Sequence, residues 1–181
     1  MTTEALYKLR FPIGEFKTPT MISSALINSW IDDIEAFPEA IKNLTHDLTT
    51  EQLNWTYRPE GWTIKQVVHH CADSHMNSII RFKLALTEVS PTIRPYYEDR
   101  WALLIDGNDD DLKDTLILLK GLHSKLGKLL RHISKVQLSR EFIHPEHGKR
   151  FRIDETIGVY AWHSNHHLAH VKQALKFKGQ F

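Results

Sequence analysis

RPEGWTIKQVVHHCADSHMNSIIRFKLALTE, residues 58–88, contains a turn, a helix start and a long amphipathic segment in that order. Thr63 follows the turn and is one of the residue types that cap helix N-termini. Pro91 and Pro95 stop any helix that continues beyond this stretch. Apolar residues recur after Thr63 at the spacing of one helix face, and they are Ile64, Val68, Cys71, Ile79, Phe82 and Leu86. We therefore predict a helix from Ile64 to about Leu86.

Outward from this segment, three more amphipathic helices are predicted. The first runs from about Ile22 to Leu44, and Pro38 is expected to kink or split it. Another is opened by the acidic residues of NDDD, 108–111, which suit a helix N-terminus, and it carries leucines up to Ile133. The last runs from about Thr156 to Phe177.

The connecting segments define the expected architecture. Residues 1 to about 20 contain Pro12, Gly14 and Pro19 and are predicted to form an extended lead-in, a segment without helix before the first long helix. REFIHPEHGKRFRID, residues 140–154, flanks a turn with aromatic and β-branched residues and predicts a short β-hairpin. Four long helices with long crossover connections predict an all-α four-helix bundle that forms a single domain over residues 1–181.

Composition excludes several classes of function. The chain has 181 residues, 41% of them hydrophobic and 25% charged, and a formal net charge of +1. This charge gives no electrostatic basis for a nucleic-acid or membrane partner. A single cysteine, Cys71, excludes an internal disulfide and is expected to be a small core residue. With no signal-peptide pattern at the N-terminus, a cytoplasmic location is expected.

Histidine is the unusual feature of the sequence. Seven of the twelve histidines fall in two short segments, and four of these lie in WHSNHHLAHVKQ, residues 162–173. At about 100° per residue, these four turn away from the polar sector of their helix, and they are His163, His166, His167 and His170. On the other helix His70 heads a polar stripe without lysine, which continues through Ser74, Asn77 and Arg81.

Two histidines at positions i and i+4 of a helix can share one metal ion, and a third from a facing helix leaves coordination positions open, as in catalytic zinc sites. Spacing leaves the choice of ligands open, because His163/His167 and His166/His170 are both such pairs. His69 competes with His70 in the same way, and Asp73 is expected to be an outer-shell partner or a base. His75 is expected to be a hydrogen-bonded core residue, and the isolated histidines are expected at the surface: His46, His123, His132, His144 and His147.

The chain resembles the DinB-like four-helix-bundle superfamily, and within it the YfiT group of metal-dependent hydrolases. The resemblance covers nearly the whole chain and rests on residues 58–88, on IRPYYEDRW, 93–101, and on residues 162–173. It implies up-down-down-up connectivity, frequent homodimers and one zinc or nickel ion per chain. The family pattern places ligands eight residues after Trp62 and three before Gln173, which implies the set His70, His166 and His170. His163 and His167 are then left to the outer shell or to packing.

Three functions are compatible with such a site. The leading hypothesis is a hydrolase for a small-molecule substrate in which the metal ion activates water, with Asp73 or an outer-shell histidine as a proton relay. The second, suggested by relatives in the superfamily, is an S-transferase that activates a low-molecular-weight thiol such as bacillithiol. The third is a non-enzymatic metal-binding stress protein. A nucleotide cofactor is not expected, since no phosphate-binding glycine loop or Rossmann signature is present.

Overall fold

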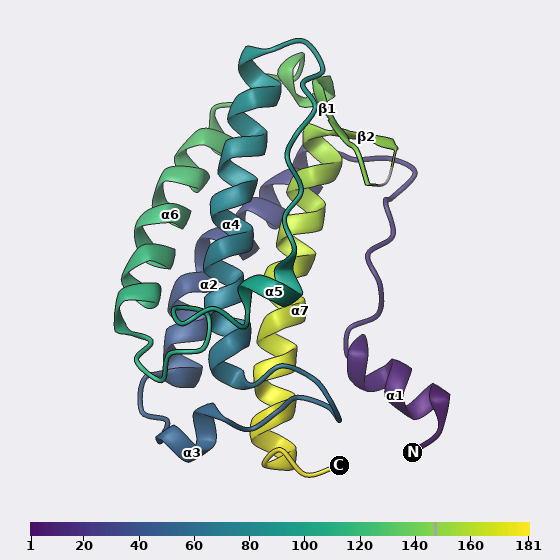
Figure 1. Ribbon diagram of the computed structural model, residues 1–181. Helices are drawn as coiled ribbons and strands as arrows, with labels where there is room; N and C mark the ends of the chain where they lie inside the picture. The colour runs from purple at the N-terminus through teal and green to yellow at the C-terminus, as the bar shows by residue number, and fades with distance from the viewer. Residues whose placement is uncertain (147) are drawn as a thin grey trace.

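The computed structural model of the protein describes residues 1–146 and 148–181 and shows a four-helix bundle (Figure 1). The four predicted helices are confirmed. They are α2 (Ser24–Thr45), α4 (Ile64–Thr87), α6 (Lys113–Arg131) and α7 (Ile153–Phe177). Shorter elements join them: α1 (Thr3–Arg10), α3 (Thr50–Leu53), α5 (Glu98–Trp101), a 3₁₀ turn (Gln137–Ser139), β1 (Glu141–His144) and β2 (Lys149–Arg152).

The direction of the helices matches the expected up-down-down-up connectivity. In Figure 1, α2 and α7 run toward one end of the bundle, and α4 and α6 run toward the other. Each of α2 and α4 packs against both α6 and α7. The crossover from α4 to α6 returns along the whole bundle and carries α5 on its way (Figure 1). The antiparallel pair α4 and α7 therefore brings the two histidine-rich segments face to face.

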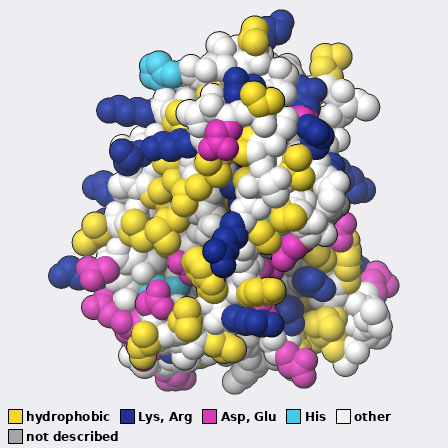
Figure 2. Space-filling view, turned by 45° about the horizontal axis from the view of Figure 1, so that its top comes forward, with side chains coloured by type: hydrophobic (Ala, Val, Ile, Leu, Met, Phe, Trp, Pro, Cys, Tyr) yellow, Lys and Arg dark blue, Asp and Glu magenta, His cyan; other side chains and the backbone are white. Residues whose placement is uncertain are grey.

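The ends of α4 and α6 follow from local sequence. Thr63 is the N-cap of α4 and forms a capping box with Gln66, in which each side chain accepts from the other residue's backbone N–H. At the start of α6, the Asp111 carboxylate accepts from the Lys113 backbone N–H at 2.8 Å. Acidic side chains gather near this end and basic ones toward the opposite end of the molecule (Figure 2), a distribution that complements the helix dipole of α6.

The expectation of an extended lead-in is wrong for residues 3–10. Thr2 caps α1 by accepting from the Ala5 backbone N–H, and Glu4 and Lys8 form an i,i+4 ion pair. No residue of α1 is buried. The end of α1 is held from α7, where the Gln173 amide donates to the carbonyl of Leu9 at 2.9 Å. From Phe11 the chain runs without a helix to the start of α2 (Figure 1).

Pro38 does not split the first long helix, which continues from Ser24 to Thr45. The predicted hairpin is confirmed, with Phe142 opposite Phe151 in an antiparallel pair. The hairpin also holds the crossover, because Ile143 accepts from the Ile93 N–H and donates to the Pro91 carbonyl. Among the described residues, no helix combines the length and the apolar character that a membrane span needs.

The core consists of two apolar clusters rather than one. The first contains Phe37, Val68, Cys71, Leu119 and Val171 among others, and Cys71 is fully buried as expected. The second cluster lies toward the hairpin end of the bundle. It is formed by the same four long helices and contains, among others, Ile34, Phe82, Leu126, Ile157 and Tyr160. Along α4, α6 and α7, the positions between these clusters include His75, His123 and His163. A layer of histidines therefore separates two apolar cores.

Candidate metal centre

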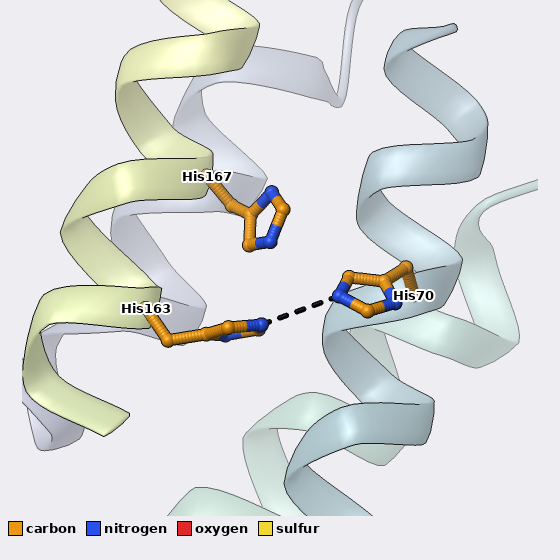
Figure 3. A group of neighbouring side chains, drawn as sticks. All are labelled: His70, His163 and His167. Carbon is orange, nitrogen blue, oxygen red and sulfur yellow. Dashed lines mark hydrogen bonds between the residues drawn. The ribbon is translucent and has the colours of Figure 1, made fainter. Parts of the chain in front are cut away.

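Three histidines converge between α4 and α7. His70 of α4 faces His163 and His167 of α7, and one ring nitrogen from each lies within 4.8 Å of the other two (Figure 3). The Nε2 atoms of His70 and His163 are 3.2 Å apart. The His167 ring meets both others edge to face, with centroids 4.9 Å from His70 and 4.4 Å from His163. In the described part of the chain, this is the group of three side chains suited to hold one ion.

His166 and His170 lie outside this group, so the ligand set implied by the family pattern is not the one that the fold brings together. His166 stacks on Trp162 with ring centroids 4.4 Å apart. His170 stacks on Tyr57, and its Nε2 donates to the Arg10 carbonyl at 3.0 Å. The reason is rotation around α7: residues three apart point about 60° from each other. One i,i+4 pair therefore faces α4, and the other faces the N-terminal segment and the Tyr57 loop.

The competing histidine of α4 points elsewhere. His69 contacts the Thr115 hydroxyl through Nδ1 at 2.8 Å and the Asp109 carbonyl through Nε2 at 3.1 Å. His69 thus ties α4 to the start of α6, and of these two neighbouring histidines His70 is the one that turns toward α7. The Asp73 carboxyl is also outside the three-histidine group. Burial and the nearby Asp106 raise the pKa of Asp73 to about 6.

The isolated histidines divide into two groups. His46 and His132 are exposed as expected, and His147 lies outside the described residues. His123 and His144 are buried instead, and His123 is only 1% exposed. Its position between Leu119 and Leu126 on the apolar face of α6 was the signal that could have placed it inside. His75 is confirmed as a hydrogen-bonded core histidine.

The three converging imidazoles are held in their neutral form. Burial, and then the neighbouring His166, lower the pKa of His70 to about 4. Burial and the other histidines hold the pKa values of His163 and His167 well below 6.5. Each ring therefore keeps an unprotonated nitrogen at neutral pH, as a metal ligand must. Three imidazole donors without a thiolate fit an open, catalytic type of site rather than a closed structural one.

The Arg81 guanidinium is linked to the metal centre through Tyr160. Arg81 of α4 donates from Nη1 to the Tyr160 hydroxyl at 3.3 Å, and the Tyr160 ring lies 5.9 Å from that of His163. The Nε of Arg81 is buried without a hydrogen-bond partner. No carboxylate of the described residues forms an ion pair with Arg81. The guanidinium therefore has an N–H donor available for a ligand.

Comparison with known proteins identifies the family of the chain. The family model of the DinB superfamily matches residues 33–171. The chain belongs to the DinB superfamily. A protein of Oceanobacillus iheyensis, 47% identical over 93% of this chain and 97% of its own length, is named as a metal-dependent hydrolase, with the activity marked in the name as provisional. The protein YfiT of Bacillus subtilis, named in the same way, is 43% identical over 94% of this chain and 96% of its own length.

The solved structure of B. subtilis YfiT shows the same fold. Its TM-score to this DinB-superfamily protein is 0.92, with 95% of this chain and 98% of that chain covered. The structure is described as a four-helix bundle of unusual topology. The predicted fold and family are therefore confirmed.

Proposed function

We propose that this DinB-superfamily protein is a metal-dependent hydrolase whose ion is held by His70, His163 and His167. The observation that supports it is the convergence of three neutral imidazoles, buried or half-buried, from two helices on one point. When bound, a divalent ion supplies Lewis-acid chemistry that activates water and polarises the bond to be cleaved. The names of the relatives point in the same direction.

The chain's own residues supply the remaining functions. Asp73, half-buried and with its pKa raised to about 6, is the carboxyl we propose as the proton relay. We propose one zinc or nickel ion per chain, since both metals accept imidazole ligands.

The substrate, we propose, is a small molecule that carries an anionic group. The unpartnered buried Nε of Arg81, whose hydrogen-bond partner Tyr160 lies next to His163, supports this, because a guanidinium with an unsatisfied N–H gains most from a carboxylate or phosphate. Replacement of Arg81 with Gln should raise KM for an anionic ester about 10- to 100-fold, the effect of losing one charge-assisted hydrogen bond of about 1.5–3 kcal/mol. Steady-state kinetics on an anionic ester and its neutral analogue measure this.

The matched control for that prediction is Arg81→Lys, which keeps the positive charge. It should recover part of the loss for the anionic ester. An equal rise of KM for the neutral ester in R81Q would show that Arg81 only braces Tyr160, and would contradict an anionic substrate.

A thiol S-transferase is the second candidate function. It is favoured by the composition of the three-histidine group, which contains no carboxylate to act as a general base. Activation of a thiol at a metal ion needs less help from such a base, because coordination itself deprotonates the thiol.

The metal-loaded protein should be assayed against a panel of esters and amides, and against an electrophile with and without bacillithiol. We expect ester or amide hydrolysis that is lost in His163→Ala. Turnover that requires the thiol would favour the S-transferase instead. If neither reaction occurs while metal removal lowers the melting temperature, the protein is a metal-binding protein without this enzymatic activity.

A further inference from the structure

We propose that two chains of hydrogen-bonded histidines, each ending on a backbone carbonyl, fix the tautomers of His163 and His167 so that both present an unprotonated Nε2 to the metal centre. His75 and His123 form one chain, and His170 forms the other. These three are positioning residues, because they act through the ligands. The proposal rests on the proposed metal site, but the tautomers themselves exist without metal.

The first chain crosses the bundle from α7 to α2. His163 Nδ1 lies 3.0 Å from His75 Nε2, and His75 Nδ1 lies 2.7 Å from His123 Nε2. His123 Nδ1 then lies 2.6 Å from the carbonyl oxygen of Ile34. Each ring uses both of its nitrogens, so no member can change its tautomer without breaking a contact.

The carbonyl at the end sets the direction of every bond in the chain. A carbonyl oxygen can only accept, so His123 carries its proton on Nδ1 and its Nε2 becomes an acceptor. His75 must then donate from Nδ1 and accept at Nε2. His163 in turn donates from Nδ1, which leaves its Nε2 unprotonated and turned toward His70.

Two features of the sequence make this arrangement possible. Pro38 has no N–H, so the carbonyl four residues earlier, that of Ile34, lacks its helical donor and is free to accept from His123. Burial supplies the second condition, that each ring is neutral. His75 and His123 are each only 1% exposed, and burial disfavours the charged form of an imidazole.

The second chain is shorter and ends on the N-terminal segment. His170 Nε2 donates to the Arg10 carbonyl at 3.0 Å, so His170 Nδ1 is an acceptor. His167 Nδ1 lies 3.4 Å from it and is therefore the donor, which leaves His167 Nε2 unprotonated. Stacking of His170 on Tyr57, with ring centroids 3.7 Å apart, holds the intermediate ring in place. His166 and His170 have the i,i+4 spacing of metal ligands but different roles. His166 packs on Trp162, and His170 positions His167.

His70 differs from the other two ligands. Because His163 Nε2 is an acceptor, the 3.2 Å contact requires His70 to donate from Nε2. To bind a metal ion through Nε2, His70 must instead carry its proton on Nδ1, because a ligand nitrogen has to be unprotonated. We therefore expect His70 to be the ligand whose tautomer changes when metal binds, whereas His163 and His167 keep theirs.

The direct test is long-range ¹H–¹⁵N NMR of the imidazoles in the metal-free wild-type protein at neutral pH. We expect Nδ1–H tautomers for His75, His123, His163 and His167, and Nε2–H tautomers for His70 and His170. An Nε2–H tautomer at His163 or at His167 would overturn the proposal. Because no metal is present, this result is independent of whether the protein is a hydrolase.

A substitution tests the consequence for metal binding. His123→Leu removes both contacts of the last ring, so His163 should populate both tautomers and the affinity for Zn²⁺ or Ni²⁺ should fall about 10- to 100-fold. His69→Leu is the matched control, since it also removes a buried, doubly bonded histidine of the bundle. Equal losses of affinity in both variants would show a general destabilisation and contradict positioning. Should His123→Leu fail to fold, the wild-type NMR measurement still decides.

Discussion

Alanine at position 163 or 167 should reduce bound metal from a near-stoichiometric amount to background, whereas alanine at position 166 should leave it close to wild type. The reason is geometric: His163 and His167 meet His70, whereas His166 stacks on Trp162 and has no nitrogen in the three-histidine group. Loss of one of three ligands should weaken binding more than about 100-fold, the upper end of the effect of outer-shell changes. Elemental analysis and competition with a chelator measure this.

His166→Ala is the matched control for this prediction, since it removes a buried histidine from the same helix. His170→Ala should give an intermediate loss, because it removes only the acceptor of the His167 Nδ1–H. Loss of metal in His166→Ala together with retention in His163→Ala would restore the set His70, His166 and His170 and contradict the arrangement of the fold.

Acidification should unfold the metal-free protein between about pH 6.5 and 4. Burial lowers the pKa of His70, His123 and His166 to about 4 and that of His170 to about 3, and it lowers those of His75, His163 and His167 as well. Below pH 6.5 the histidines of the unfolded chain therefore bind protons, whereas those of the folded chain stay neutral. The free energy of unfolding then decreases as the pH is lowered. Each such group contributes about 1.4 kcal/mol per pH unit, so several together offset a stability of about 5–15 kcal/mol.

Asp73 acts in the opposite direction, because its raised pKa favours the folded state once the carboxyl is protonated. One half-buried carboxyl does not offset seven histidines whose pKa values are lowered. Circular dichroism with urea titration at pH 7.5, 6, 5 and 4.5 measures the free energy of unfolding. Saturating zinc should shift the loss of stability further into acid from the midpoint of the metal-free protein, in proportion to its affinity. A free energy that stays level down to about pH 4.5 would show that the histidines are hydrated and titrate normally.

The sequence by itself determined the helices, the hairpin and the inward direction of the histidines. Thr63 with Gln66, the apolar period after Ile64 and the sequence Pro-Glu-His-Gly at positions 145–148 are local signals, and each acts within a few residues. The family resemblance added the connectivity, which periodicity alone cannot give. The short helix α1 was missed because Pro12, Gly14 and Pro19 outweighed a cap and one ion pair nearer the N-terminus.

Only the tertiary structure decided which histidines act together. Both i,i+4 pairs of α7 face inward, and the choice between them depends on the rotation of α7 relative to α4, which no local pattern records. The same holds for His123, which meets His75 across the bundle at the height where Pro38 leaves the Ile34 carbonyl free. The physical reason is that hydrogen bonds between helices join residues tens of positions apart, so their geometry is set by packing of the apolar clusters on either side.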